Sequence, residues 1–247
     1  TVQAEIIFPK RTLMNDPNYQ LFPDLTSSIF GLHAVNASDT DLSFASDNTI
    51  NFSVVASKNV NDKRDASIVL KTIGGSDILT SVSTRKYIGL YDNQKWNIAF
   101  RLKPSGYPNP AAVKDTFQTY TYELYGNSHI SDTIHEEFNV TGTIPLASAA
   151  KFFTEPKRIF AGSNRTNFTG SVINYSDVKV SSVRAWYSYL DDETMRAHGR
   201  DSSNYGAIHP FKNSNLTDAV NVLGTKIPQI KTLVLNWSLD NVTGSDI

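Results

Sequence analysis

Cysteine is absent from the 247 residues of the sequence. Disulfide bonds, thiolate metal ligands and a cysteine nucleophile are therefore excluded. No apolar run reaches the ~18 residues of a membrane-spanning helix, so no span is expected. The chain does not start with a basic stretch followed by an apolar one, and no signal peptide is visible. It also lacks an initiating Met, and we expect it to be a segment of a longer polypeptide.

An excess of positive charge is also missing. The chain has 23 Lys and Arg against 24 Asp and Glu, a formal net charge of −1. A nucleic-acid-binding protein usually has a basic excess or a basic stripe, and we expect no nucleic-acid partner. The basic dipeptides Lys63-Arg64 and Lys157-Arg158 are interpreted as solvated turns. With 40% hydrophobic and 19% charged residues, the composition is that of a folded chain rather than a disordered one.

Short segments with strand patterns make up most of the sequence. In the clearest one, 117–125, Tyr120 and Tyr122 share one face and Tyr125 lies on the other, and either face could form a ligand surface. We expect Gly126 and Asn127 to end this strand and 133–140 to pair with it as a hairpin. The other expected strands are 5–8, 28–35 (with a bulge or close packing at Gly31), 49–57, 66–72, 87–91, 96–102, 158–161, 178–190 and 232–239.

One helix is expected, over 191–199. Acidic residues at Asp191, Asp192 and Glu193 suit the positive end of the helix dipole, and Gly199 suits a left-handed C-cap. Many strands and one helix predict an all-β fold, a two-sheet antiparallel sandwich. We expect one domain over 1–230, with 231–247 as a closing strand or the start of a following domain. The least patterned stretches are 111–115 and 199–229.

Carboxylates arranged for catalysis are not evident. A glycosidase needs two of them ~5–9 Å apart. Glu136 and Glu137 are neighbours on a strand, so their side chains point to opposite faces. The acids at 191–193 fit a helix start instead. The Gly-rich stretch 74–77 lacks the Lys-Ser/Thr of a phosphate loop and is interpreted as a hairpin turn. We therefore predict no catalytic residues and no enzymatic activity.

No metal or cofactor site is predicted. The five histidines follow no metal-binding spacing; they are His33, His129, His135, His198 and His209. Asp92 and Asp177 lie in expected loops and could ligate Ca²⁺, but neither belongs to a recognisable series of ligands.

Tryptophans and glycosylation sequons have simple interpretations. Trp96, Trp186 and Trp237 lie in apolar strand segments, which favours core packing over sugar stacking. Nine Asn-x-Ser/Thr sequons occur, and we interpret them as products of a composition rich in these residues, since Asn236 lies within an expected strand. The sequons begin at Asn36, Asn51, Asn139, Asn164, Asn167, Asn174, Asn215, Asn236 and Asn241.

Part of the sequence resembles laminin G-type domains of the concanavalin A-like class, over about residues 30–200. The resemblance implies a jelly-roll arrangement of the sandwich. The calcium-binding Asp pattern of secreted laminin G domains is not evident, which weakens any transfer of glycan or receptor binding. The matching segments are a Trp-led strand, the strand after it and a closing pattern: Lys95–Phe100, Tyr122–Gly126, Arg158–Gly162, Asn167–Gly170 and Val183–Trp186.

A longer set of segments resembles large virion structural proteins of tailed bacteriophages, particularly marine T4-like ones. This resemblance implies a virion location, a non-catalytic structural or interaction role in tail, neck or surface, other virion proteins as partners, and oligomerisation through assembly. Adhesion to a host-surface glycan, a lectin-like carbohydrate-binding role and, more weakly, polysaccharide hydrolysis are the alternatives. The segments are Lys157-Arg158, Asn164–Gly170, Ser176–Val180, His198, Asp201, Asn204–Gly206, Leu233–Trp237 and Val242–Asp246.

Overall fold

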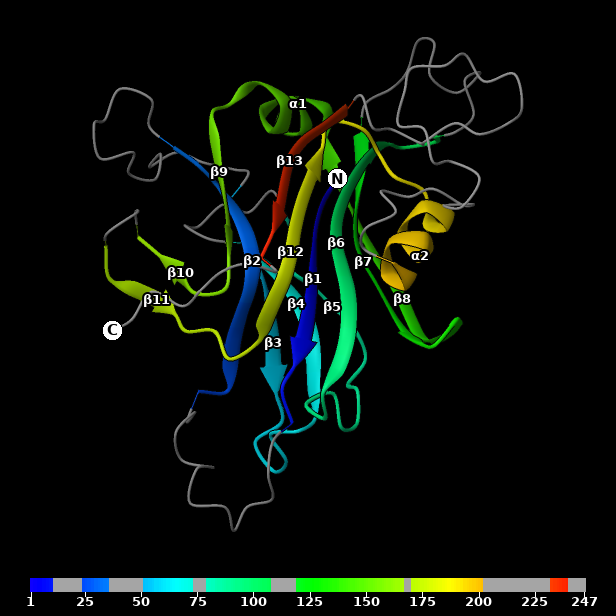
Figure 1. The fold of residues 1–247 in the computed structure, drawn as a ribbon. Coiled ribbons are helices and arrows are strands. Elements are labelled where there is room, and N and C mark those ends of the chain that lie inside the picture. Colours follow the sequence, from blue (N-terminus) through cyan, green and yellow to red (C-terminus); the bar gives the residue numbers. More distant parts are fainter. Residues whose placement is uncertain are drawn as a thin grey trace.

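Two large antiparallel β-sheets packed face to face make up the body of the protein (Figure 1). The computed structural model describes residues 1–10, 24–35, 51–72, 79–107, 119–166, 170–201 and 232–239. The prediction of an all-β, two-sheet antiparallel sandwich is confirmed. The expected hairpin turn at 74–77 and the loose stretch 111–115 lie outside the described residues.

The larger sheet has six strands in the order β13-β12-β1-β6-β7-β8. The first strand of the chain, β1, lies between β6 and β12, so chain-distant segments pair at the centre of the sheet. β7 and β8 form the expected hairpin. The strand bounds are Val2–Phe8 for β1, Gln94–Pro104 for β6, Thr119–Ile130 for β7, Thr133–Pro145 for β8, Lys179–Trp186 for β12 and Leu233–Ser238 for β13.

The second sheet has five strands in the order β5-β4-β3-β2-β9. Its edge strand β9 follows β6, β7 and β8, which belong to the six-stranded sheet. A separate two-stranded ribbon, β10 and β11, follows β9. The bounds are Thr26–Ala34 for β2, Phe52–Lys58 for β3, Ala66–Thr72 for β4, Val82–Ser83 for β5, Lys157–Ala161 for β9, Asn164–Arg165 for β10 and Val172–Asn174 for β11.

Alternating side-chain direction along the strands builds the core between the sheets. In β1 the side chains of Ala4, Ile6 and Phe8 are fully buried in it, while Gln3 and Glu5 point to the outer face of the six-stranded sheet. Large aromatic side chains such as Trp96 and Tyr122 fill the space between the layers. Apolar area buried in this way contributes roughly 25 cal/mol per Å², which makes this core the main stabilising element.

Helix α2 (Asp192–Arg200) covers the outer face of the six-stranded sheet over β6 and β7 (Figure 1). Asp191 is its N-cap and accepts a 2.8 Å hydrogen bond from the Thr194 amide, as the acidic start predicts. The prediction of Gly199 as a C-cap is wrong. Gly199 lies within the helix, and Asp201 is the C-cap. Glycine is needed at 199 because a side chain there would collide with the sheet.

A second helix, α1 (Leu146–Thr154), was not expected from the sequence. It has no side-chain N-cap and no acidic residue in its first turn, so the usual start signals are missing. The helix forms where it can pack Ala149 and Phe152 into the core at one end of the sandwich. Tertiary packing therefore decides this segment.

Three strand predictions need correction. Residues 87–91 form a turn rather than a strand: Gly89 has a φ of +65°, and Tyr87 makes only an isolated bridge to Ala66. β7 does not end at Gly126 but continues to Ile130, because the absent side chain leaves room for the Phe138 ring. β12 ends at Trp186, four residues earlier than expected.

Gly31 confirms the expected irregularity in β2. The register of β2 against β3 shifts between Ser28 and Phe30. A Cβ atom on Gly31 would lie 2.3 Å from the Phe52 carbonyl oxygen and 2.4 Å from the Phe160 ring. Only glycine fits at this position of β2, between β3 and β9.

Candidate functional site

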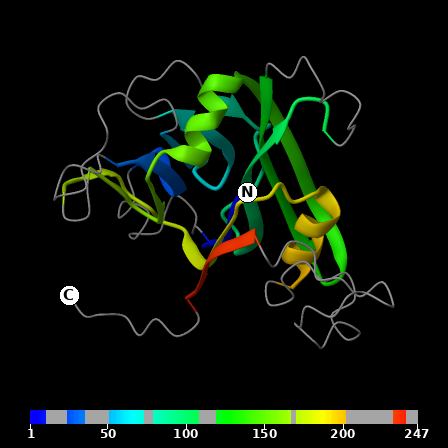
Figure 2. The ribbon, with the colours of Figure 1, turned by 90° about the horizontal axis from the view of Figure 1, so that it is seen from above.

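A cavity of about 630 Å³ opens between the edges of the two sheets. We call it the sheet-edge groove. β9 and the following β10 border it on one side, the ends of β12 and β13 on the other, and α1 at one end. Figures 1 and 2 show β13, in red, and α1 around this side of the sandwich. Its volume lies within the ~300–1,000 Å³ range of small-molecule sites in proteins.

Apolar side chains form the floor of the groove. Phe100 and Phe152 come from the main core, and Ile159, on β9, and Leu235, on β13, complete the floor. Between the two edges the core is thus open to the surface. A ligand that enters would exchange water for hydrocarbon and aromatic contacts.

Three exposed aromatic side chains line the groove: Phe153, Tyr187 and Trp237. Tyr187 is 65% exposed and Trp237 is 44% exposed, and both line the groove. The prediction that all three tryptophans fill the core is therefore wrong for Trp237, whereas Trp96 and Trp186 are buried as expected. Trp237 differs because β13 is an edge strand with most of its residues on the surface.

Among the described residues that line the groove, the charged side chains are all basic. Lys157 and Arg158 begin β9, and Arg165 lies on β10. Burial holds the pKa of Lys157 and of Arg158 below their ordinary values. Interpreting Lys157-Arg158 as a turn is thus wrong, since both residues belong to a strand that lines the cavity. Lys63 and Arg64 do lie in a turn, as expected.

His33 belongs to the same region. It lies opposite Arg158 in the pairing of β2 with β9, and its ring meets the Phe160 ring edge to face at 4.9 Å. Burial and the nearby Arg158 charge lower the pKa of His33 to about 4. The imidazole is therefore neutral at pH 7. The groove lining combines exposed aromatic side chains at the rim, an apolar floor and three basic side chains.

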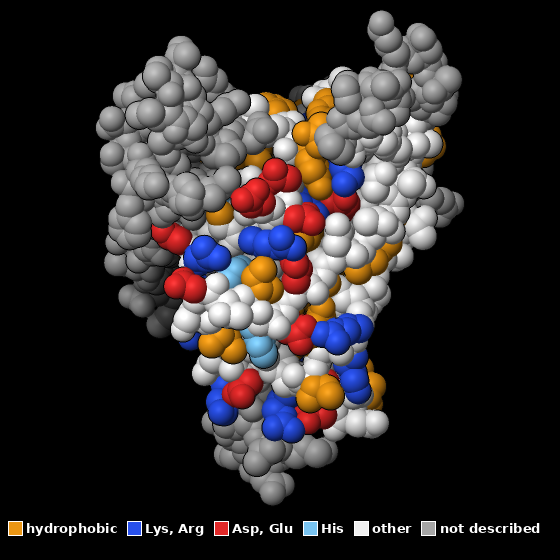
Figure 3. All heavy atoms as spheres, turned by 90° about the vertical axis from the view of Figure 1, so that its right-hand side faces the viewer, with side chains coloured by type: hydrophobic (Ala, Val, Ile, Leu, Met, Phe, Trp, Pro, Cys, Tyr) orange, Lys and Arg blue, Asp and Glu red, His pale blue; other side chains and the backbone are white. Residues whose placement is uncertain are grey.

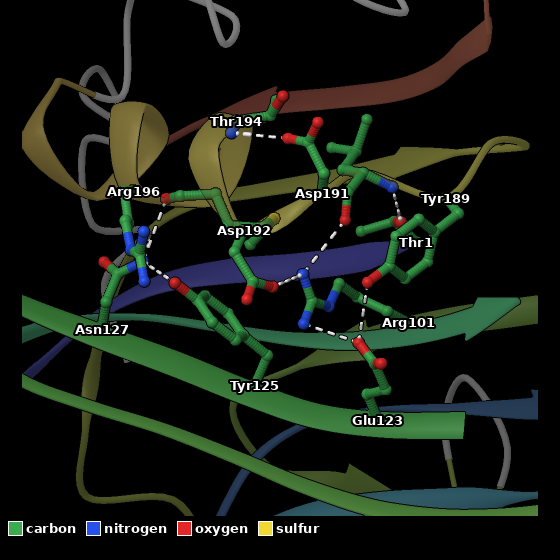
Figure 4. A network of polar contacts seen from close by, with 12 residues as sticks. Thr1, Arg101, Glu123, Tyr125, Asn127, Tyr189, Asp191, Asp192, Thr194 and Arg196 are labelled. Carbon is green, nitrogen blue, oxygen red and sulfur yellow. Dashed lines mark hydrogen bonds and ion pairs between the residues drawn. The ribbon is translucent and has the colours of Figure 1, made fainter. Parts of the chain in front are cut away.

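A second cluster of polar side chains lies beneath α2, on the outer face of the six-stranded sheet (Figure 4). Its centre is Arg101, which is fully buried. The guanidinium contacts the Glu123 carboxylate at 2.6 Å and the Asp192 carboxylate at 2.7 Å, and donates to the Leu190 carbonyl at 3.1 Å. Its plane also lies 4.2 Å from the Tyr125 ring centre.

Further contacts extend this cluster along β6, β7 and β8. Glu123 also binds Lys103 at 2.6 Å and accepts from the Tyr189 hydroxyl at 3.1 Å. Arg196 of α2 holds Glu137 with two hydrogen bonds of 2.8 and 2.9 Å. Those hydrogen bonds are the main reason that the pKa of Glu137 is lowered.

The cluster beneath α2 is a structural clasp. Asn127 donates to the Met195 carbonyl at 3.0 Å, so the helix backbone is tied to β7 as well. Acids and bases pair with one another throughout, which leaves a balanced charge. Figure 3 shows acidic and basic side chains intermixed on this side of the molecule, with neither sign gathered into a patch. Such pairing fixes a helix on a sheet rather than presenting a reactive group.

The acids considered from the sequence all have partners or capping roles. Glu136 pairs with Arg85 and Glu137 with Arg196, so the two neighbours do serve different faces. Asp191 caps α2 and Asp192 binds Arg101. Glu193 lies in the first turn of α2.

The two possible calcium ligands are likewise engaged. Asp177 forms a buried ion pair with Lys58 and accepts from the Tyr91 hydroxyl at 2.8 Å. Asp92 forms an exposed ion pair with Lys10 at 3.0 Å. The structure does not bring Asp92 and Asp177 together into one set of ligands. Among the residues that the structure describes, no three His, Asp or Glu side chains gather where they could hold a metal ion.

The histidines are dispersed. His198 donates a 2.8 Å hydrogen bond from its Nδ1 atom to the Gln3 Oε1 atom and stacks on Trp186. His135 is exposed near the start of β8. Burial lowers the pKa of His129, and His209 lies outside the described residues. Within the described ranges, neither helix has the length and apolar character to cross a bilayer.

Sequons and tyrosines complete the sequence-based candidates. Asn51 accepts from the Ala34 amide at 2.7 Å and is buried, as is Asn164, so neither side chain is accessible to a glycan in the folded protein. Of the two tyrosine faces, Tyr122 lies in the core and Tyr125 beneath α2, and neither is a surface. Sequons at Asn36, Asn167, Asn215 and Asn241 lie outside the described residues.

The sheet-edge groove was missed in the sequence. Its basic residues are the pair Lys157-Arg158 and, seven positions after Arg158, Arg165, and two of its exposed aromatic residues, Tyr187 and Trp237, lie 50 positions apart in the chain. The one local signal was the basic pair directly before the apolar segment 159–161. Searches against models of protein families, curated proteins and solved structures found no match, so the resemblance to laminin G-type and virion proteins has no support from them.

Proposed function

We propose that this chain is a non-catalytic structural and interaction module of a bacteriophage virion protein, in tail, neck or surface. Its contacts with other virion proteins or with the host would be made through the sheet-edge groove. The observation that carries the interaction role is the groove itself, an open cavity of about 630 Å³ between the edges of the two sheets. The virion assignment rests on the sequence resemblance alone.

The absence of facing acids in the groove supports the non-catalytic role. A polysaccharide hydrolase needs a carboxylic acid and a carboxylate on either side of its substrate. None of the described residues that line the groove is acidic. Glu123 and Asp192, which do lie on neighbouring elements, share the guanidinium of Arg101 between them (Figure 4).

We also propose the jelly-roll connection of the concanavalin A-like class. Two features favour it: the first strand lies at the centre of the six-stranded sheet, and β9 returns to pair with β2 after three strands in the opposite layer, β6, β7 and β8. A solved structure that traced the chain through a different order of strands would refute it.

Mass spectrometry of purified particles tests the virion role. Particles of a phage whose genome encodes this chain should contain it at a fixed copy number, in proportion to a known tail protein. If thoroughly washed particles lack the chain while infected-cell lysates contain it, the virion role is refuted. The measurement does not depend on what the groove binds.

A lectin-like carbohydrate-binding domain is the second candidate. It is favoured by the exposed rings of Tyr187 and Trp237, since a half-exposed aromatic ring can stack on the apolar face of a sugar. A glycan array compares the unmodified protein with Trp237→Ala, and with Ile88→Ala as a control at an exposed apolar position that does not line the groove. Glycan signals that Trp237→Ala removes and Ile88→Ala retains would support this candidate.

A further inference from the structure

The residues that line the sheet-edge groove limit the chemical class of ligand that it can bind. The inference below rests on the proposed function, since it takes this groove as the contact surface. Side chains from both sheets and from α1 make the floor hydrocarbon and aromatic, for example Leu102, Phe152 and Leu235. A sugar would leave its hydroxyl groups against this floor without hydrogen-bond partners, which is unfavourable. The part of a ligand that enters must therefore be apolar.

The charged side chains among the described residues of the lining are all positive. Lys157 donates to the Glu155 carbonyl at 2.6 Å and Arg165 to the Gly170 carbonyl at 3.0 Å, so both of these hydrogen bonds go to backbone oxygen atoms. Arg158 adds a third cation, and no carboxylate is among the described residues that line the cavity.

Cations at the side of an apolar groove fit a ligand with an apolar body and an anionic end. We infer that the sheet-edge groove binds an aliphatic carboxylate, with its chain on the floor between the sheets and its carboxylate near Lys157, Arg158 and Arg165. The hydrocarbon chain supplies the affinity through area removed from water. The carboxylate supplies the selectivity, because an ion pair in a partly desolvated groove is stronger than one in bulk water.

Fluorescence displacement on the 247-residue chain tests this inference. The probe is 1-anilinonaphthalene-8-sulfonate, which has an aromatic body and an anionic group. Decanoate should displace it at a concentration at least about tenfold lower than decyltrimethylammonium, which has the same chain and the opposite charge. N-phenyl-1-naphthylamine, the same ring system without the sulfonate, reports on the apolar floor alone.

Charge variants identify the site. Lys157→Gln and Arg165→Gln should each weaken decanoate binding about two- to fivefold, and leave binding of the neutral probe unchanged. Arg85→Gln is the matched control, since Arg85 pairs with Glu136 and does not line the groove. Raising the salt concentration should weaken decanoate binding and spare the neutral probe. The neutral probe also shows that each variant retains its fold.

Three results would overturn the inference. Equal displacement by decanoate and decyltrimethylammonium would show that the cations do not select the ligand. Failure of both probes to bind the unmodified protein would show that the groove is covered by the chain itself. Unchanged decanoate binding in both lysine and arginine variants would place the site elsewhere. In each case the particle measurement remains valid, so the proposed function and this inference fail separately.

Discussion

The side-chain amide of Asn127 on β7 occupies the position where a side chain on Gly199 of α2 would begin. A Cβ atom on Gly199 would lie 1.9 Å from the Asn127 Oδ1 atom and 3.0 Å from the His129 Nδ1 atom. The same Asn127 donates to the Met195 carbonyl one turn earlier in the helix. Close approach of helix and sheet thus depends on a glycine in the helix interior.

Gly199→Ala is expected to destabilise the protein by about 1–3 kcal/mol, through overpacking against Asn127. In an unconstrained helix the same change stabilises by about 1 kcal/mol, so the sign separates packing from helix propensity. Urea unfolding of the two proteins measures the difference. The double variant with Asn127→Ala should show a smaller effect of the alanine at 199 than the single variant does. A stabilised Gly199→Ala protein would contradict the close approach.

Arg101→Met is expected to destabilise the protein by about 3 kcal/mol, because it leaves the buried Glu123 carboxylate without the guanidinium that contacts it. Lys103 remains as a partner of Glu123 and limits the loss. The matched control is Arg196→Met. Its ion pair with Glu137 is about half exposed, and its loss is expected to cost at most about 1 kcal/mol. Equal effects of the two variants on the free energy of unfolding would refute the structural clasp.

Local patterns in the sequence predicted much of the fold, and long-range packing decided the rest. β4 occupies the predicted 66–72, and Asp191 caps α2, because periodicity and capping depend on neighbours in the chain. Local patterns predict Gly126 and Gly199 as ends of elements. Each is in fact the place where another element's side chain needs space, which no local pattern records.

The candidate site could not be predicted for the same reason. The groove forms where β9 of one sheet and β13 of the other stay apart, and its residues come from distant parts of the chain. The exposure of Trp237 also follows from its position on an edge strand. An apolar strand segment has the same sequence pattern at an edge as at the centre of a sheet.

Stability is expected to fall as the pH decreases from about 6.5 towards 4, in part through His33. Its pKa is about 4 in the folded protein, below its ordinary value of 6.5, so the unfolded chain takes up the proton first. The contribution of neutral His33 to the free energy of unfolding is fully present above pH 6.5. Roughly 3 kcal/mol of it is lost by pH 4. Unfolding of the unmodified protein and of His33→Gln at several pH values measures it. The variant should show the shallower dependence, and parallel curves would contradict the burial of a neutral His33.

Asp177→Asn is expected to destabilise the protein by about 3–5 kcal/mol, since it removes the carboxylate that pairs with the buried Lys58 ammonium. The control is Asp92→Asn, whose exposed ion pair with Lys10 should contribute less than about 1 kcal/mol. Because Lys58 and the Tyr91 hydroxyl engage the Asp177 carboxylate, millimolar Ca²⁺ should leave the melting temperature of the unmodified protein unchanged. A rise in melting temperature with Ca²⁺ that Asp177→Asn abolishes would show instead that the carboxylate exchanges its lysine partner for the metal.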